Sequence, residues 1–172
     1  MMPQVQRVSD LLTEEKFRFK ALVYAPHGFG KTTWAADPKL DPGIVPCEDG
    51  VANGLLSVAH LNPEVFVVKS LTDLQLVASG QVFKEKPTLV LDSVSYMAKT
   101  FVKDSALAIP RKSGTSLKRA AGVPELDDYG TMGAILHATL HKILSLDKNI
   151  LVTAAWRQKD PKEDEPGTRT EI

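Results

Sequence analysis

Short apolar runs that end at turn residues recur along the chain, and they predict buried β-strands. The runs cover residues 20–24, 43–47, 65–68, 88–92 and 149–153. They are apolar at consecutive positions, which is typical of strands that are buried on both faces. Pro46 weakens the second of these predictions, because proline has no N–H to donate to a sheet ladder.

Segments with helical features lie between these runs. Helices are expected over residues 31–36, 71–84 and 127–146. In the last of them, apolar side chains recur at helical spacing on one face, namely Tyr129, Met132, Leu136, Leu140, Ile143 and Leu144. Strands that alternate with helices predict an α/β fold, in which a parallel sheet is covered by helices on both sides.

Composition limits the class of protein. A chain of 172 residues is long enough for one domain, and its 21 basic and 21 acidic residues cancel, so no whole-chain field attracts nucleic acid. A single cysteine, Cys47, excludes an internal disulfide and fits a reducing compartment. We find no signal-peptide core and no run of about 20 apolar residues, so we expect a cytoplasmic protein without a membrane contact.

The turn after the first predicted strand carries the most specific pattern. Residues 25–32 read Ala-Pro-His-Gly-Phe-Gly-Lys-Thr. Glycines let backbone N–H groups face an anion, the lysine neutralises the outer phosphates, and the following hydroxyl ligates Mg²⁺. This P-loop predicts ATP and Mg²⁺ as ligands, bound by Pro26, His27, Gly28, Phe29, Gly30, Lys31, Thr32 and Thr33.

Two features of this loop need comment. Ala25 stands where the first glycine is usual, and alanine is tolerated there when the turn does not demand a positive φ. Without a ligand, the Lys31 ammonium is expected to be solvated rather than packed. The alternative for the whole segment is a glycine-rich turn with a purely structural role.

Two carboxylates are candidates for the chemistry of hydrolysis. Asp92 ends the fourth predicted strand and, with Thr32, is expected to hold the metal ion; the alternative is that Asp92 or Ser93 caps the next helix. Hydrolysis also needs a base that orients the attacking water. Glu48 follows the second predicted strand and is expected to be that base, with Lys31 as the second catalytic residue.

The segments APHGFGKTT, VPCEDG and LVLDSVSYM together resemble the RecA-like recombinase core. The resemblance is closest to phage-encoded RecA-like ATPases, also described as AAA-family ATPases, that act in single-strand annealing. Asp128-Tyr129-Gly130 and Val152-Thr153-Ala154 match their pattern as well. The resemblance implies a three-layer P-loop NTPase fold and ATPase activity in phage-type DNA recombination. It also implies a homo-oligomer, as a ring or filament, in the cytoplasm of a host bacterium.

The resemblance also divides the chain. We expect an N-terminal extension at residues 1–18, a RecA-like ATPase core at 19–157 and a polar tail at 158–172. The glutamine that such cores use to sense the γ-phosphate has no clear counterpart here, since Ala154-Ala155-Trp156-Arg157 occupies that region. RecA-like cores continue with further strands, so we expect this chain to be truncated.

The resemblance places a DNA-binding loop after the fourth strand and its helix. Four cations fall there and are expected to contact the phosphates of single-stranded DNA: Arg111, Lys112, Lys118 and Arg119. The alternative is a solvated surface loop. Arg157 is a candidate for the cation that a neighbouring subunit supplies to the nucleotide.

Other functions stay open. The main alternative is a nucleotide-regulated assembly, packaging or partitioning ATPase without direct DNA contact, and a small-molecule kinase is a weaker third hypothesis. His137 and His141 have a spacing that can bind zinc, but no third ligand is evident and a plain helix surface is the favoured interpretation.

Overall fold

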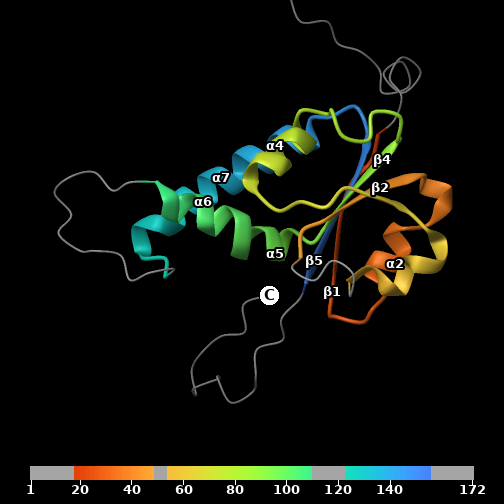
Figure 1. The fold of residues 1–172 in the computed structure, drawn as a ribbon, viewed down its shortest axis with the longest axis horizontal. Helices are drawn as coiled ribbons and strands as arrows, with labels where there is room; N and C mark the ends of the chain where they lie inside the picture. Colours follow the sequence, from red (N-terminus) through yellow and green to blue (C-terminus); the bar gives the residue numbers. More distant parts are fainter. Residues whose placement is uncertain (1–17, 49–53, 110–122, 156–172) are drawn as a thin grey trace, which may run out of the picture.

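The computed structural model describes residues 18–48, 54–109 and 123–155 (Figure 1). Several residues named above lie outside these ranges: residues 1–17, the tail from 156 with Arg157, and the basic-loop residues Arg111, Lys112, Lys118 and Arg119. In chain order the elements are β1 (Lys20–Ala25), α2 (Lys31–Ala35), η1 (Pro38–Leu40), β2 (Pro42–Pro46), η2 (Leu56–Leu61), β3 (Glu64–Val65), α4 (Leu71–Ala78), β4 (Thr88–Asp92), α5 (Val94–Met97), the π-helical stretch η3 (Ala98–Val102), α6 (Lys103–Ala108), α7 (Leu126–Leu144) and β5 (Asn149–Ala155).

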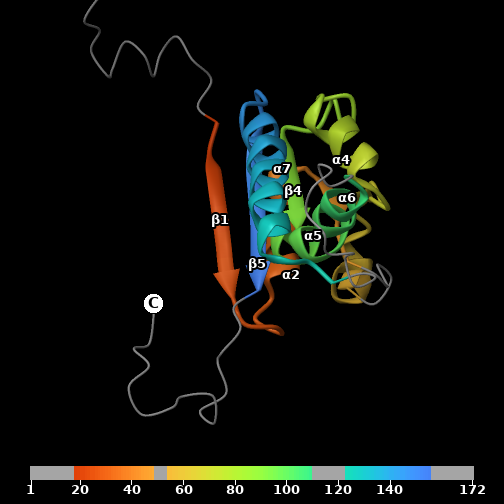
Figure 2. The ribbon, with the colours of Figure 1, turned by 90° about the vertical axis from the view of Figure 1, so that its left-hand side faces the viewer.

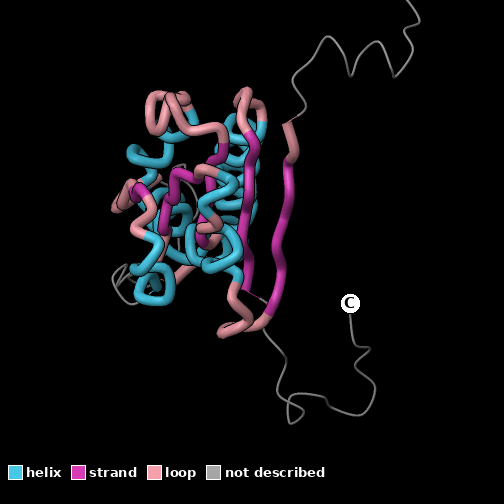
Figure 3. Tube along the Cα trace, turned by 90° about the vertical axis from the view of Figure 1, so that its right-hand side faces the viewer, coloured by secondary structure: helices cyan, strands magenta, loops and turns pink. Residues whose placement is uncertain are grey.

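The strands form one parallel sheet in the order β1-β5-β4-β2-β3. The last described strand, β5, therefore lies between β1 and β4. Its register with β1 runs from Lys20↔Ile150 to Ala25↔Ala155. Figures 2 and 3 show β1 at the edge of the described sheet, with β5 as its neighbour. Since the strands are parallel, their carboxyl ends share one edge, and this confirms the expected α/β fold class.

The core has two halves, one on each face of the sheet. Alternate residues of β4 show the division, because Leu89 and Leu91 pack with α4, η3 and α7, whereas Val90 packs with α2 and η2. Figure 1 shows α4, α5, α6 and α7 on one side of the sheet and α2 on the other. The three central strands are thus buried on both faces, as their unbroken apolar runs predict. Among the described helices, none is long and apolar enough to cross a membrane.

Two predicted elements are shorter than expected. The helix over residues 71–84 was predicted too long: α4 ends at Ala78, and Gly80 and Phe83 then have positive φ values of 72° and 54° that a right-handed helix excludes. The strand over residues 65–68 was also wrong in extent. β3 consists of Glu64–Val65, and Val67 beyond it is 41% exposed.

Pro46 is part of β2 after all, and the pairing explains why. Cys47 donates its N–H to the carbonyl of Asp92 over 2.7 Å, so the backbone of Cys47 faces β4. Successive residues of a strand face opposite neighbours, so Pro46 faces the side of β3. The paired part of β3 ends at Ile44↔Val65, and the missing N–H of Pro46 therefore costs no ladder bond.

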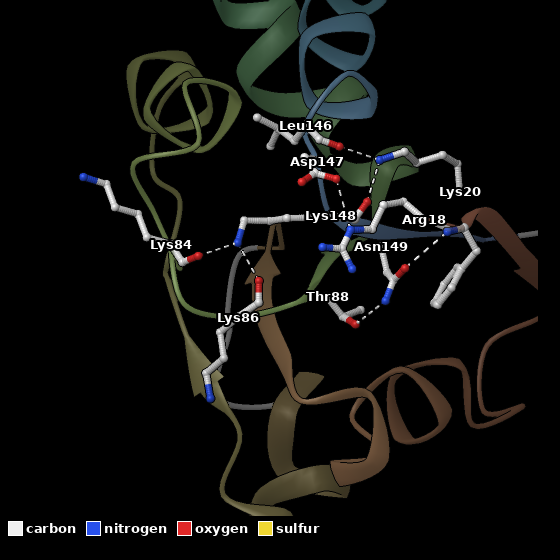
Figure 4. A network of polar contacts seen from close by, with 10 residues as sticks. Arg18, Lys20, Lys84, Lys86, Thr88, Leu146, Asp147, Lys148 and Asn149 are labelled. Carbon is white, nitrogen blue, oxygen red and sulfur yellow. Dashed lines mark hydrogen bonds and ion pairs between the residues drawn. The ribbon is translucent and has the colours of Figure 1, made fainter. Parts of the chain in front are cut away.

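A network of lysines fastens the amino-terminal edge of the sheet (Figure 4). The Lys148 Nζ donates to the carbonyl oxygens of Phe83, Lys84 and Lys86 at 2.8, 2.8 and 2.5 Å. The Lys20 Nζ donates to the carbonyls of Leu146 and Lys148 at 2.6 and 2.5 Å. We call these two lysines and their five carbonyls the lysine clamp. It joins the start of β1, the loop before β4 and the loop before β5.

Candidate functional site

The turn between β1 and α2 has the backbone shape of a phosphate-binding loop. Gly28 and Gly30 have φ values of 80° and 74°, in the left-handed region that side chains disfavour. No atom lies within 4 Å of the place where a Cβ would sit on either residue, so conformation and not crowding requires glycine. Because α2 has only five residues, its contribution to anion binding is the N–H groups of its first turn rather than a long-helix dipole.

Lys31 is the first residue of α2, and the expectation that its ammonium is solvated is wrong. The Lys31 Nζ donates to the carbonyl of Ala25 over 2.8 Å and to that of Pro26 over 2.9 Å. An ammonium carries three donors, and the curved loop brings its own carbonyls within their reach. A bound phosphate would compete with these carbonyls for the same lysine.

The carboxylate of Asp92, the last residue of β4, is held from two sides. Thr32 Oγ1 donates to Asp92 Oδ2 over 2.6 Å, and Thr153 Oγ1 donates to Asp92 Oδ1 over 2.5 Å. The alternative of a helix cap is not what the structure shows, because Ser93 is the N-cap of α5 and makes no side-chain cap hydrogen bond. The P-loop, β4 and β5 thus meet at one carboxylate.

Glu48 lines the same cavity as Asp92 and lies just beyond β2. The Cys47 N–H bonded to the Asp92 carbonyl extends the ladder, so Glu48 follows at the same edge of the sheet. Burial, together with the negative charges of Asp92 and Glu48, raises the pKa of the Cys47 thiol to about 12. Cys47 is therefore a neutral, buried side chain within the electrostatic influence of both carboxylates.

These groups line one cavity of about 310 Å³. Its walls include six of the eight residues expected in the P-loop, together with both candidate carboxylates; the full lining is His27, Gly28, Gly30, Lys31, Thr32, Thr33, Glu48, Gly54, Ser57, Asp92, Ser93 and Ala155. Pro26 and Phe29 do not line the cavity, and the Phe29 side chain is 74% exposed. The structure therefore brings Lys31, Glu48 and Asp92 together from three distant parts of the sequence.

Sequence reasoning missed several neighbours of the site. Gly54, Ser57, Ser93 and Ala155 line the cavity, and Thr153 bonds to Asp92. Only Thr153 left a signal, since it is a hydroxyl residue within the apolar run of β5. Ser93 and Ala155 lie in segments that the resemblance had singled out, but without a predicted contact to the cavity, and Gly54 and Ser57 lie in a segment without a distinctive pattern.

The donor set of the site fits Mg²⁺. Thr32 Oγ1 and Asp92 Oδ2 are hard oxygen donors 2.6 Å apart at the mouth of the P-loop. Mg²⁺ is usually held by one or two carboxylates plus substrate phosphates and waters, so a cage of several acidic side chains is not needed. Within the described ranges, no group of three or more His, Cys, Asp or Glu residues could hold a metal by itself.

The histidine pair on α7 does not change this assignment. The rings of His137 and His141 stack with centroids 6.1 Å apart. Neither histidine belongs to a group of three or more candidate ligands in the described part of the chain.

A three-layer α/β sheet with a glycine-rich loop after its first strand, and an acidic residue at the end of a nearby strand, defines a P-loop NTPase. A family model described as an AAA domain matches residues 18–172. The chain therefore belongs to this AAA-domain family, whose members are nucleotide-binding ATPases and often oligomerise. No curated protein matches the sequence.

Proposed function

We propose that the chain binds ATP with Mg²⁺ in this cavity and hydrolyses the γ-phosphate. The observation that supports this most directly is the 2.6 Å hydrogen bond between Thr32 Oγ1 and Asp92 Oδ2. It joins the P-loop to the acidic strand, and a hydroxyl and a carboxylate in these two places hold the metal ion in P-loop NTPases. When bound, Mg²⁺ would neutralise charge on the phosphate oxygens.

The other residues of the cavity have complementary roles in this proposal. Backbone N–H groups of the loop bind the phosphates, and Lys31 leaves its two carbonyls to neutralise the outer phosphate. The carboxylate of Glu48 accepts a proton from water as the water oxygen bonds to the γ-phosphorus. The bond from this phosphorus to the leaving oxygen of ADP breaks, which releases ADP and phosphate.

The proposal extends to single-stranded DNA as the partner, in phage-type recombination or annealing. Residues 110–122 contain the four cations Arg111, Lys112, Lys118 and Arg119 and no carboxylate, and they connect α6 to α7. Such a segment can neutralise a DNA backbone without reading bases. The resemblance to RecA-like annealing ATPases supports a ring or filament on DNA, with Arg157 reaching the nucleotide of a neighbouring subunit.

The test compares ATP hydrolysis by the purified protein with and without single-stranded DNA. We expect stimulation by DNA of any sequence, and loss of stimulation when the four loop cations are all replaced by alanine. DNA affinity should fall, and the slope of log K against log salt should decrease by about 0.7 for each lost phosphate contact. Hydrolysis that DNA does not stimulate would favour an assembly, packaging or partitioning ATPase without direct DNA contact.

A further inference from the structure

Thr153 is a fully buried polar residue, and the other residues of β5 from 150 to 155 are apolar. Its Oγ1 lies 2.5 Å from Asp92 Oδ1 and 3.4 Å from the Leu91 carbonyl. A hydroxyl has one hydrogen to donate, and the contact with Asp92 Oδ1 is much the shorter of the two. The hydroxyl therefore serves Asp92 rather than the backbone.

The position of β5 explains how this residue reaches the site. β5 pairs with β4 up to Leu91↔Val152, so Thr153 lies one step further along, level with Asp92. On its other side, Thr153 is in register with Val23 of β1, two residues before the P-loop strand ends. β5, which lies between β1 and β4, thus places the Thr153 hydroxyl against the Asp92 carboxylate.

Two hydroxyls hold the two oxygens of Asp92 in different directions. The last torsion of an aspartate side chain is broad, so packing alone does not fix the plane of the carboxylate. With Oδ1 bonded to Thr153 in the interior, Oδ2 is the oxygen that faces Thr32 at the cavity. Loss of the Thr153 donor would leave Oδ1 without this partner and free the carboxylate to rotate.

We propose that Thr153 is a positioning residue that sets the orientation of Asp92 and thereby the Mg²⁺ affinity of the nucleotide site. This inference rests on the proposed function, because it takes Asp92 as a metal ligand. Hydrogen-bond partners of metal ligands commonly change metal affinity by about 10–100-fold when they are removed.

The experiment compares Thr153→Val, which keeps the shape without the hydroxyl, with Thr153→Ser, which keeps the hydroxyl. ATP binding is titrated against Mg²⁺ for each variant, and binding in EDTA is measured as well. For Thr153→Val, we expect the half-saturating Mg²⁺ concentration to rise by about tenfold or more. Thr153→Ser should restore the parental value, and binding in EDTA should be the same for all three proteins. If Thr153→Val is too unstable to assay, Thr153→Ala replaces it with the same expectation.

Asp92→Asn separates failure of this inference from failure of the proposed function. If Asp92→Asn loses the Mg²⁺ dependence while Thr153→Val retains the parental curve, the positioning role is wrong and the metal site stands. If the parent itself binds ATP equally well with Mg²⁺ and with EDTA, the proposed metal site is wrong. A parallel loss of Mg²⁺-dependent and EDTA binding in Thr153→Val would show a structural role only.

Discussion

A lysine ammonium bonded to backbone carbonyls occurs at both the carboxyl and the amino edge of the sheet, but its role differs between the two. At the carboxyl edge, the Lys31 ammonium is held by two carbonyls that lie five and six residues away in sequence. At the amino edge, the Lys148 ammonium is held by three carbonyls that lie 62 to 65 residues away. The first contact is local and borders a cavity, whereas the second joins segments that only folding brings together. Hydrogen bonds from an ammonium to backbone carbonyls can therefore be replaceable by a ligand or can stabilise the fold, depending on the sequence separation that they span.

The surroundings of the clamp also affect the pKa of its two lysines. Desolvation lowers the pKa of Lys148 and of Lys20, so the clamp holds its ammonium groups where water is partly excluded. Carbonyl dipoles offset that cost only while all the loops stay in place. We therefore expect mutations at the two edges to separate function from stability.

The largest effect is expected for Lys31→Ala. It should abolish measurable ATP binding or hydrolysis, because Lys31 is the only lysine or arginine among the described residues that line the cavity. The unfolding midpoint should stay close to that of the parent, since the two lost contacts are local. Isothermal titration with ATP and urea unfolding measure the two quantities. Lys39→Ala, on η1 and away from the cavity, is the matched control, and parental turnover in Lys31→Ala would contradict the P-loop assignment.

The next effect is expected for Glu48→Gln. This change keeps the shape of the side chain and removes the proposed base, so hydrolysis should slow by about 10²–10⁴-fold. ATP affinity should be retained, because the phosphates bind to the loop and Lys31. Steady-state phosphate release gives the rate, and Glu85→Gln at the exposed opposite edge is the control. Normal hydrolysis by Glu48→Gln would mean that another carboxylate is the base.

Lys148→Ala should show the reverse behaviour. Three carbonyls lose a charged donor, so we expect the free energy of unfolding to fall by about 1–3 kcal/mol. ATP affinity, measured where parent and variant are both fully folded, should not change, because the clamp lies at the edge away from the cavity. Lys84→Ala is the control: it removes a lysine from the same loop but leaves the Lys84 carbonyl that the clamp uses (Figure 4). Equal stability of Lys148→Ala and Lys84→Ala would show that the clamp contributes little.

The smallest effect is expected for Lys86→Gln, also at the amino edge. The Lys86 Nζ lies 2.8 Å from Asp41 Oδ1 and 2.7 Å from Glu64 Oε1, and hydrogen bonds to these two carboxylates raise the pKa of Lys86 above its ordinary value of 10.5. When folding raises the pKa of a basic group, the folded state is stabilised at pH values below the pKa in the unfolded state. This stabilisation disappears as the pH rises through the pKa in the folded state. The stability difference between parent and Lys86→Gln should therefore shrink above pH 10.5 and also at high salt. If neither high pH nor high salt changes the stability difference between the parent and Lys86→Gln, the contribution of Lys86 to stability is not ionic.

The strands and the phosphate loop could be predicted from the sequence because each depends on local pattern. Five apolar runs indicate strands, but the prediction that all of them are buried was wrong for β1 and β3: β1 alternates between exposed and half-buried residues, and β3 has no buried residue. Gly28 and Gly30 adopt the positive φ values that their motif implies. The end of α4 was predicted too late although a local signal exists, because Gly80 directly follows the C-cap Ser79 and has the positive φ that commonly ends a helix. The contact of the Phe83 ring with Gly43, 2.4 Å from where a Cβ would lie, depends on tertiary packing and carries no such signal.

The long-range parts of the site were less predictable. Strands that are apolar on both faces carry no information about their order, so the place of β5 between β1 and β4 could not be deduced from its residues. The bond from Thr153 to Asp92 depends on that order, and so does the meeting of Thr32 with Asp92. The contact of Lys31 with its own loop was missed for a different reason. The P-loop motif describes how the lysine binds a phosphate, and it does not indicate which atoms the lysine contacts without one.

The position of β5 also has a consequence for the order of folding. During synthesis the chain emerges from its N-terminus, so β2, β3 and β4 are available for pairing long before β5. β1 has only β5 as its partner among the described strands, and must wait for residues 149–155 although it is the first of these strands to be made. The hydrogen bonds of Asp92 to Thr32 and Thr153 span 60 and 61 residues, and contacts of such separation form slowly. The moment at which a nascent chain becomes able to bind nucleotide is therefore set by the synthesis of β5 rather than of its phosphate loop.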